Sequence, residues 1–180
     1  AAQAQIPVLI IGSPAREKGL SLSESYHWLS NWIGTDDNKA STDQIVSLIG
    51  TGMSSDQLTL EADRALKNCD IIIGAKRMLE MAEHYHKPTF CSYNYPAITD
   101  YMLSHPEYQH FAVLFSGDIG FYSGAAGLRR CLEGKPFKIE SFSGISSPIH
   151  FLNTIGKTWS DVHLISCHGQ TASIISHIRC

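Results

Sequence analysis

Phe111-Ala-Val-Leu-Phe-Ser-Gly-Asp-Ile-Gly-Phe-Tyr-Ser-Gly124 is the stretch of sequence that decides the fold. Its first five residues are apolar or β-favouring and are followed by turn formers, which predicts a short buried strand. The glycine-rich loop after this strand carries one carboxylate, Asp118, and its glycines allow close backbone approach to a ligand. Ligands of open parallel sheets bind beyond the carboxyl ends of strands, so the loop is a candidate binding site. An ordinary turn in which Asp118 caps the next helix explains this stretch equally well.

Strands and helices are expected to alternate on both sides of this stretch. The expected strands are Val8–Ile11, Ile45–Ile49, Asp70–Ile73, Thr89–Tyr93, Phe111–Phe115, Phe137–Phe142 and Val162–Ser166. The expected helices are Ser23–Trp32, one through Ala62 and Cys69 with Thr59 as its N-cap, Lys76–Glu83, Ile98–Leu103, Ala125–Leu132, Pro148–Ile155 and Thr171–Ile178. Because most of these strands are almost continuously apolar, the pattern predicts an α/β fold with a largely parallel sheet flanked by helices.

Composition limits the classes of function. The 180 residues are 43% hydrophobic, which is enough to form a core. The formal net charge of −3 provides no field that would attract nucleic acid or an anionic membrane. No apolar run approaches the roughly 18 residues of a membrane span. The five cysteines are widely spaced without a CxxC pair, which favours a soluble protein of the reducing cytoplasm and no zinc site.

Three strand ends carry polar or glycine-rich loops, namely Gly50–Gly52, Ser116–Asp118 and Ser143–Ser147. A parallel sheet would bring all three to one edge. The first loop is not a Walker A motif, because no Gly-Lys-Ser/Thr follows, and it is not GxGxxG, because Ser55 replaces the third glycine. These loops supply backbone groups, hydroxyls and one carboxylate. They could match the hydrogen-bonding groups of a buried ligand that contains a ribose and an amino-acid part. His84, His86 and Cys91 do not have the spacing of a known metal site.

Five motifs, taken in order, resemble the tetrapyrrole methylase family. They are Gly50-Thr-Gly-Met-Ser-Ser-Asp-Gln-Leu-Thr59, Gly74-Ala-Lys-Arg-Met-Leu79, Ser116-Gly-Asp-Ile-Gly-Phe-Tyr-Ser123, Gly144-Ile-Ser-Ser147 and Ser166-Cys-His-Gly169. The second and third most resemble methyltransferases that act on the C5 meso carbon of precorrin-6Y or its cobalt form. The resemblance runs from about Ile45 to the C-terminus.

The resemblance implies an S-adenosylmethionine-dependent C-methyltransferase of cobalamin biosynthesis, with two α/β domains around the cofactor and usually a homodimer. The implied cofactor-binding residues are Ser116, Gly117, Asp118, Phe121, Ser146 and Ser147. The implied substrate-binding residues are Gly50, Thr51, Gly52 and Met53, and the carboxylate-fringed tetrapyrrole makes Lys76, Arg77, Arg129 and Arg130 further candidates. These cations are alternatively a solvated surface. No catalytic side chain is assigned, because methyl transfer from a sulfonium needs positioning rather than a protein nucleophile.

The sequence departs from the family pattern in several places. Family members commonly have Pro-Gly where this chain has Met53-Ser54, and proline where it has Ile119 and Ser143. We expect residues 1–44 to be an N-terminal extension without an assigned role, 45–158 to be the first methylase domain, and 159–180 to begin a truncated second domain. The alternatives are a non-catalytic ligand-binding or regulatory protein with the same fold, or another family member such as a uroporphyrinogen methyltransferase.

Overall fold

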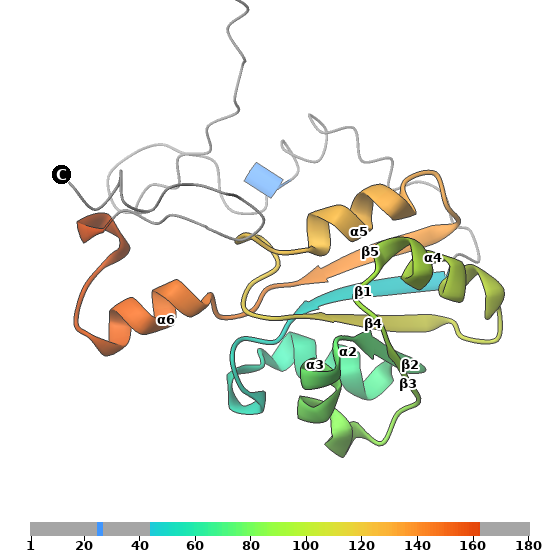
Figure 1. Cartoon of the computed structure of the whole chain (residues 1–180), viewed down its shortest axis with the longest axis horizontal. Coiled ribbons are helices and arrows are strands. Elements are labelled where there is room, and N and C mark those ends of the chain that lie inside the picture. Colours follow the sequence, from blue (N-terminus) through green and yellow to red (C-terminus); the bar gives the residue numbers. More distant parts are fainter. Residues whose placement is uncertain (1–24, 27–43, 163–180) are drawn as a thin grey trace, which may run out of the picture. The chain divides into compact units, whose positions relative to one another are not determined.

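A single five-stranded sheet organises the computed structural model, which describes residues 25–26 and 44–162 (Figure 1). The chain divides into two units, Ala1–Ser41 and Thr42–Cys180, and the sheet belongs to the second. Its strands are β1 (Gln44–Gly50), β2 (Ile71–Gly74), β3 (Thr89–Cys91), β4 (His110–Phe115) and β5 (Phe137–Phe142). Their order across the sheet is β3-β2-β4-β1-β5, and every pairing is parallel. The predicted α/β fold with a parallel sheet is confirmed.

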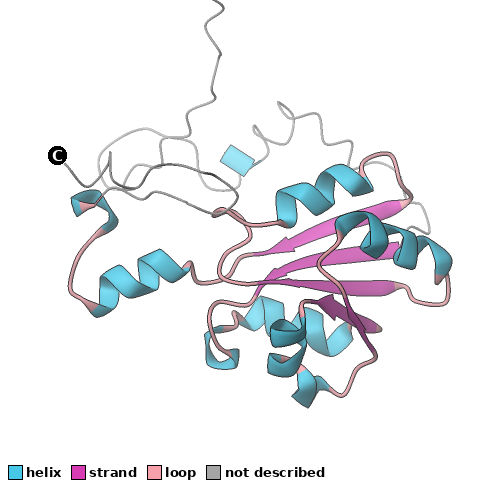
Figure 2. Cartoon of the chain, viewed as in Figure 1, coloured by secondary structure: helices cyan, strands magenta, loops and turns pink. Residues whose placement is uncertain are grey.

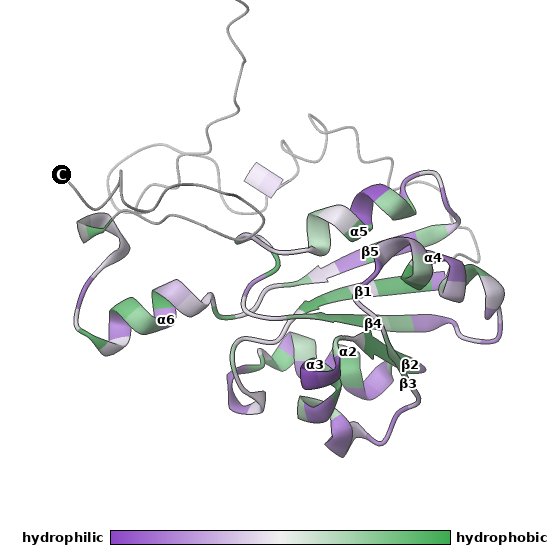
Figure 3. Cartoon of the chain, in the orientation of Figure 1, coloured by the Kyte–Doolittle hydropathy of each residue, from purple (hydrophilic) through white to green (hydrophobic). Residues whose placement is uncertain are grey.

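Helices cover both faces of the sheet (Figure 2). They are α2 (Leu60–Asn68), α3 (Lys76–Met81), α4 (Tyr95–Ser104) and α5 (Ala125–Leu132). A further helix, α6 (Ser147–Thr154), lies beyond the carboxyl ends of the strands rather than on a face of the sheet (Figure 1). The 3-10 turns are η1 (Ser55–Gln57), η2 (Glu83–Tyr85) and η3 (Trp159–Asp161). Successive side chains of a strand point to opposite faces, so β4 supplies Phe111 and Val113 to the core beneath α4 and α5. Its Ala112 and Leu114 enter the core beneath α2 and α3. Figure 3 shows the resulting apolar strands.

The central strand β1 positions the site. It pairs with β4 from Ile45↔His110 to Gly50↔Phe115 and with β5 from Gln44↔Phe137 to Ile49↔Phe142. These registers bring the carboxyl ends of the three strands to the same edge of the sheet. The loops that follow β1, β4 and β5 are therefore neighbours.

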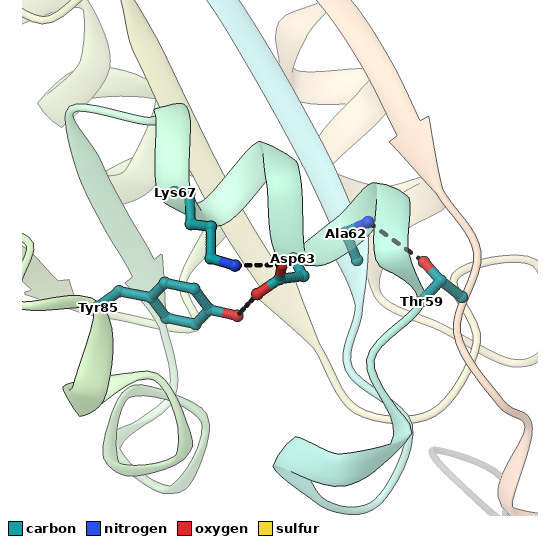
Figure 4. A network of polar contacts seen from close by, with 5 residues as sticks. All are labelled: Thr59, Ala62, Asp63, Lys67 and Tyr85. Carbon is teal, nitrogen blue, oxygen red and sulfur yellow. Dashed lines mark hydrogen bonds and ion pairs between the residues drawn. The ribbon is translucent and has the colours of Figure 1, made fainter.

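The helix through Ala62 begins as its sequence predicts. The Thr59 hydroxyl accepts a hydrogen bond from the Ala62 amide at 3.2 Å, so Thr59 is the N-cap of α2. One turn later, Asp63 accepts from Lys67 Nζ at 2.7 Å and from the Tyr85 hydroxyl at 2.8 Å (Figure 4). The hydrogen bond from Lys67, followed by that from Tyr85, lowers the pKa of Asp63 below its ordinary value. This network attaches α2 to η2.

Several element boundaries differ from the sequence-based expectation. α3 ends at Met81 rather than Glu83, and α6 spans Ser147–Thr154 rather than Pro148–Ile155. α4 begins at Tyr95 rather than Ile98, because Asn94 Oδ1 accepts from the Ala97 amide at 3.0 Å and Pro96 suits the first turn. β3 ends at Cys91 rather than Tyr93. The expected strand Val8–Ile11 and helix Thr171–Ile178 lie outside the described residues. So do the expected helix Ser23–Trp32, apart from the helical pair Ser25 and Tyr26, and the strand Val162–Ser166, apart from Val162.

Candidate ligand-binding edge

Three glycines pack against one another where β1, β4 and β5 end. A Cβ added to Gly50 would lie 2.7 Å from the Gly117 carbonyl oxygen and 2.7 Å from the Gly144 nitrogen. Real Cβ atoms essentially never come that close to backbone, and a Cβ on Gly144 would also collide with Gly50 and Gly117, so the loops can meet only because Gly50 and Gly144 have no side chain. The convergence of the three loops that the sequence predicted is confirmed.

The first two loops are also joined by a pair of backbone hydrogen bonds. The Gly52 amide donates to the Gly117 carbonyl at 3.1 Å, and the Gly117 amide donates to the Gly52 carbonyl at 2.8 Å. Both glycines have positive φ, +66° and +69°, a conformation that side chains disfavour. The Gly50–Met53 loop and the Ser116–Ser123 loop are thus one structural assembly.

Asp118 fastens this assembly to the third loop. Its Oδ2 accepts from the Gly144 amide at 2.9 Å, and its Oδ1 accepts from the Gly120 amide at 2.8 Å. It does not cap α5, whose N-cap is Gly124. A carboxylate has about four lone-pair positions, so the two backbone contacts leave Asp118 able to accept further hydrogen bonds. Its sequence-predicted contact with a cofactor therefore stays a prediction.

Ser146 carries the most informative polar atom of the site. Its Oγ is buried and has no hydrogen-bond partner, the single such side-chain atom among the described residues. Ser146 occupies the N-cap position of α6, but its hydroxyl forms no capping hydrogen bond. Buried polar atoms are normally paired, so an unpaired hydroxyl beside the glycine loops is consistent with a ligand that completes it. The neighbouring Ser147 is exposed, and its amide lies 3.8 Å from the position of a Cβ on Gly117.

The rest of the second loop presents aromatic side chains. Phe121 is half-buried and packs edge-on against Tyr122, with ring centroids 4.8 Å apart. Tyr122 is 65% exposed and has φ +46°, which is unusual for a bulky residue. Backbone strain of this kind often occurs at functional sites. The sequence analysis did not single out Tyr122, because a sequence carries no direct signal of a left-handed tyrosine. Ser116, the first residue of the loop, is exposed.

The first loop contains one inward-facing and one exposed residue. The Thr51 hydroxyl is buried, 3.1 Å from the Phe115 carbonyl and 3.4 Å from Met78 Sδ. These contacts give Thr51 a packing role in addition to its predicted place beside the substrate. Met53 is exposed, and its amide donates to Gln57 Oε1 at 3.0 Å. Gln57 is a second residue that the sequence analysis did not single out.

The candidate cations lie on two helices, α3 and α5. Lys76 and Arg77 are exposed in the first turn of α3 after β2, and neither forms an ion pair within the described residues. Arg129 donates to the Ser141 hydroxyl on β5, and Arg130 is exposed. Their predicted contacts with an anionic substrate are not tested by this arrangement.

Other kinds of site find little support in the described residues. Burial raises the pKa of the Cys69 thiol to about 11, so this cysteine is protonated at neutral pH and is a poor nucleophile. No group of three or more metal-ligating side chains gathers among residues 25–26 and 44–162. A cavity of about 10 Å³ beside Thr51 and Met78 is large enough for about one water. No helix of the described part has the length and apolarity needed to cross a bilayer.

The fold is a parallel α/β domain. Its candidate ligand-binding site is the sheet edge where the glycine loops pack together and the Ser146 hydroxyl is unpaired. The family described as Tetrapyrrole (Corrin/Porphyrin) Methylases matches residues 46–177. This chain therefore belongs to the tetrapyrrole methylase family. A comparison with curated protein sequences finds no significant match.

Solved structures with the same fold include three methyltransferases. The methyltransferase CobJ is 19% identical with a TM-score of 0.61, over 75% of this chain and 60% of CobJ. The precorrin-6Y methylase of cobalamin biosynthesis from Archaeoglobus fulgidus is 22% identical with a TM-score of 0.55, over 72% of this chain and 67% of that protein. The uroporphyrin-III-C-methyltransferase from Thermus thermophilus is 19% identical with a TM-score of 0.55, over 64% of this chain and 54% of that protein. The chain thus spans about 60% of the length of CobJ.

Proposed function

We propose that this chain is an S-adenosylmethionine-dependent C-methyltransferase that acts on a corrin precursor. The observation that carries the proposal is the unpaired, buried Ser146 hydroxyl beside three interlocked glycine loops. Membership of a methylase family makes a methyl donor the expected ligand of such a site. A bound S-adenosylmethionine supplies an electrophilic methyl group, so the protein needs no covalent nucleophile.

The residues of the chain have two tasks in this proposal. Ser146 Oγ, the Ser147 amide and the Ser116 backbone provide polar groups for the cofactor. Gly117 allows its close approach, and Phe121 provides apolar surface. Asp118 holds the Gly120 and Gly144 amides in place, so that the cofactor meets a fixed backbone. Fixed dipoles and fixed geometry are what lower the barrier of a methyl transfer, because they need no rearrangement during the reaction.

We propose that the substrate is precorrin-6Y and that the methyl group is transferred to its C5 meso carbon. The Gly-Ala-Lys-Arg and Gly-Asp-x-Gly-Phe-Tyr-Ser motifs support this choice, and the Gly50–Met53 loop would border the macrocycle. Lys76 and Arg77 are exposed cations without ion-pair partners in the described part of the chain. Such cations are suited to substrate carboxylates. A homodimer in the cytoplasm remains part of the proposal.

A methyl-transfer assay with two substrates tests the function. The chain is incubated with methyl-labelled S-adenosylmethionine and either precorrin-6Y or uroporphyrinogen III. Label in the precorrin is the expected result. Label only in uroporphyrinogen would overturn the proposed substrate. Label in neither would overturn the proposed activity and favour a non-catalytic binding protein.

The two cations are tested in the same assay. Replacing Lys76 and Arg77 by alanine should raise the KM for the tetrapyrrole about tenfold with little change in kcat. The reason is that these cations would bind the substrate and the transition state equally well. Lys135→Ala is the matched control, since Lys135 is an exposed cation before the amino end of β5. An unchanged KM in the double variant would remove both cations from the substrate site.

A further inference from the structure

Gln57, the last residue of η1, connects two parts of the site that are distant in sequence. Its Oε1 accepts from the Met53 amide at 3.0 Å. Its Nε2 lies 3.4 Å from Nδ1 of His150, which is 93 residues away in α6. Because the Met53 amide can donate only to the oxygen, the orientation of the Gln57 amide group is determined. The NH₂ group therefore faces His150, whose Nδ1 must be the acceptor.

Gln57 also packs against the glycine that joins the first two loops. A Cβ on Gly52 would lie 2.8 Å from Gln57 Cβ and 3.0 Å from its Oε1. Gly52 is in turn hydrogen-bonded in both directions to Gly117. A continuous set of contacts thus runs from the Ser116–Ser123 loop through the Gly50–Met53 loop and Gln57 to α6, the helix that begins beside Ser146.

These contacts are not needed to bury a core. Gln57 is only half-buried, it belongs to neither hydrophobic cluster, and Met53 is exposed. An exposed loop amide could be hydrated by water at little cost. A side chain that captures this amide and also reaches α6 instead restricts where the loop lies.

We propose that Gln57 is a positioning residue that holds the Gly50–Met53 loop at a fixed place relative to α6. The proposal rests on the proposed function, in which this loop borders the substrate and the start of α6 borders the cofactor. A displacement of about 1 Å between two bound reactants costs up to about 100-fold in rate, so coupling the two walls has a direct catalytic value.

Amide hydrogen exchange of the full 180-residue chain tests the coupling without any ligand. Gln57→Met keeps the length of the side chain and removes both polar contacts, and it should accelerate exchange at the Met53 amide at least fivefold. His150→Phe removes only the second contact and should accelerate it at least twofold. The double variant should match Gln57→Met, because His150 acts through Gln57.

A control amide lies in another part of the same chain. The Asn94 amide is held by the Ser92 hydroxyl at 3.2 Å and should exchange at the wild-type rate in all three variants. Wild-type exchange at Met53 in Gln57→Met would show that Gln57 does not hold the loop. Wild-type exchange in His150→Phe would show that the loop is not coupled to α6. Either result overturns the proposal.

Enzyme kinetics give a second readout that a purely structural role would not change. Gln57→Met should lower kcat for methylation of the tetrapyrrole substrate at least fivefold, while the melting temperature stays unchanged and the Kd for S-adenosylhomocysteine stays within twofold of wild type. An unchanged kcat, or an equal loss of cofactor affinity, would contradict the assignment. If the wild-type chain methylates no tetrapyrrole, the proposed function fails, whereas the exchange experiment still decides the role of Gln57.

Discussion

At the residue scale, Tyr95 shows how single glycines determine packing near the site. Its ring lies across the start of α5, where a Cβ on Gly127 would be 2.5 Å from Tyr95 Cε2 and 2.9 Å from Cδ2. A Cβ on Gly124 would collide with the same ring. Tyr95 therefore supports the end of the Ser116–Ser123 loop through the helix that follows it.

Gly127→Ala distinguishes the effect of packing against Tyr95 from the effect of helix propensity, because the two change the stability in opposite directions. Propensity alone would stabilise the variant by about 1 kcal/mol, but the collision with Tyr95 should lower the free energy of unfolding by about 1–3 kcal/mol. In a Tyr95→Ala background the same change should become stabilising. Urea denaturation of the four proteins measures both effects. A Gly127→Ala variant as stable as wild type would show that Tyr95 has room to move.

Asp118→Asn tests the carboxylate that holds two loops. The amide group of asparagine has one acceptor oxygen, so either the Gly120 or the Gly144 amide would face an NH₂ group. The free energy of unfolding should fall by about 1–3 kcal/mol, the cost of an unpaired, partly buried donor. Asp100→Asn, on the exposed side of α4, is the control and should be neutral. Equal stability of the two variants would contradict the proposed anchoring.

Some residue roles follow from sequence and others do not. Thr59 was identifiable as an N-cap, because a cap acts on an amide three residues away. The contact between Gln57 and His150 was not, because the two residues are 93 positions apart and most of the sheet lies between them in sequence. The strained φ of Tyr122 depends on how its loop closes against neighbouring strands, which no local pattern encodes.

At the scale of elements, the Asp63 network predicts how stability depends on pH. The pKa of Asp63 is lowered in the folded chain, first by Lys67 and then by Tyr85. A lowered pKa contributes stability that is present above the ordinary value of 3.8 and is lost as the pH falls through the folded value. The attachment of α2 to η2 should therefore weaken in acid.

Tyr85→Phe isolates this contribution. The variant should be less stable than wild type at pH 7, and the difference should shrink as the pH falls below about 3.8, because protonated Asp63 is a weaker acceptor. Thermal denaturation at a series of pH values measures it. Tyr93→Phe, at an 84% exposed tyrosine, is the control. A Tyr85→Phe deficit that does not change with pH would contradict the charge-assisted bond.

Element types were more predictable than element ends. α5 and β5 have the bounds that hydrophobic periodicity predicts, Ala125–Leu132 and Phe137–Phe142. α4 begins three residues earlier than expected because Asn94 and Pro96 provide a better start than the apolar pattern suggests. Capping hydrogen bonds, rather than periodicity, determine such ends.

At the scale of the molecule, the order of the strands explains why distant motifs form one site. With β1 between β4 and β5, the loops after all three strands meet at one edge. The sequence predicted a parallel sheet and this convergence. It did not predict the glycine-to-glycine packing, because that depends on the actual register of three strands.

The central claim is that the converged loops bind S-adenosylmethionine, and calorimetric titration with S-adenosylhomocysteine tests it most directly. The wild-type chain should bind. Ser146→Ala should fold at least as stably as wild type, since it removes an unpaired buried hydroxyl. It should nevertheless bind about 3- to 10-fold more weakly, the value of one lost hydrogen bond. Ser104→Ala, at an exposed hydroxyl in α4, should bind like wild type. No binding by the wild-type chain, or undiminished binding by Ser146→Ala, would contradict the site described for this protein.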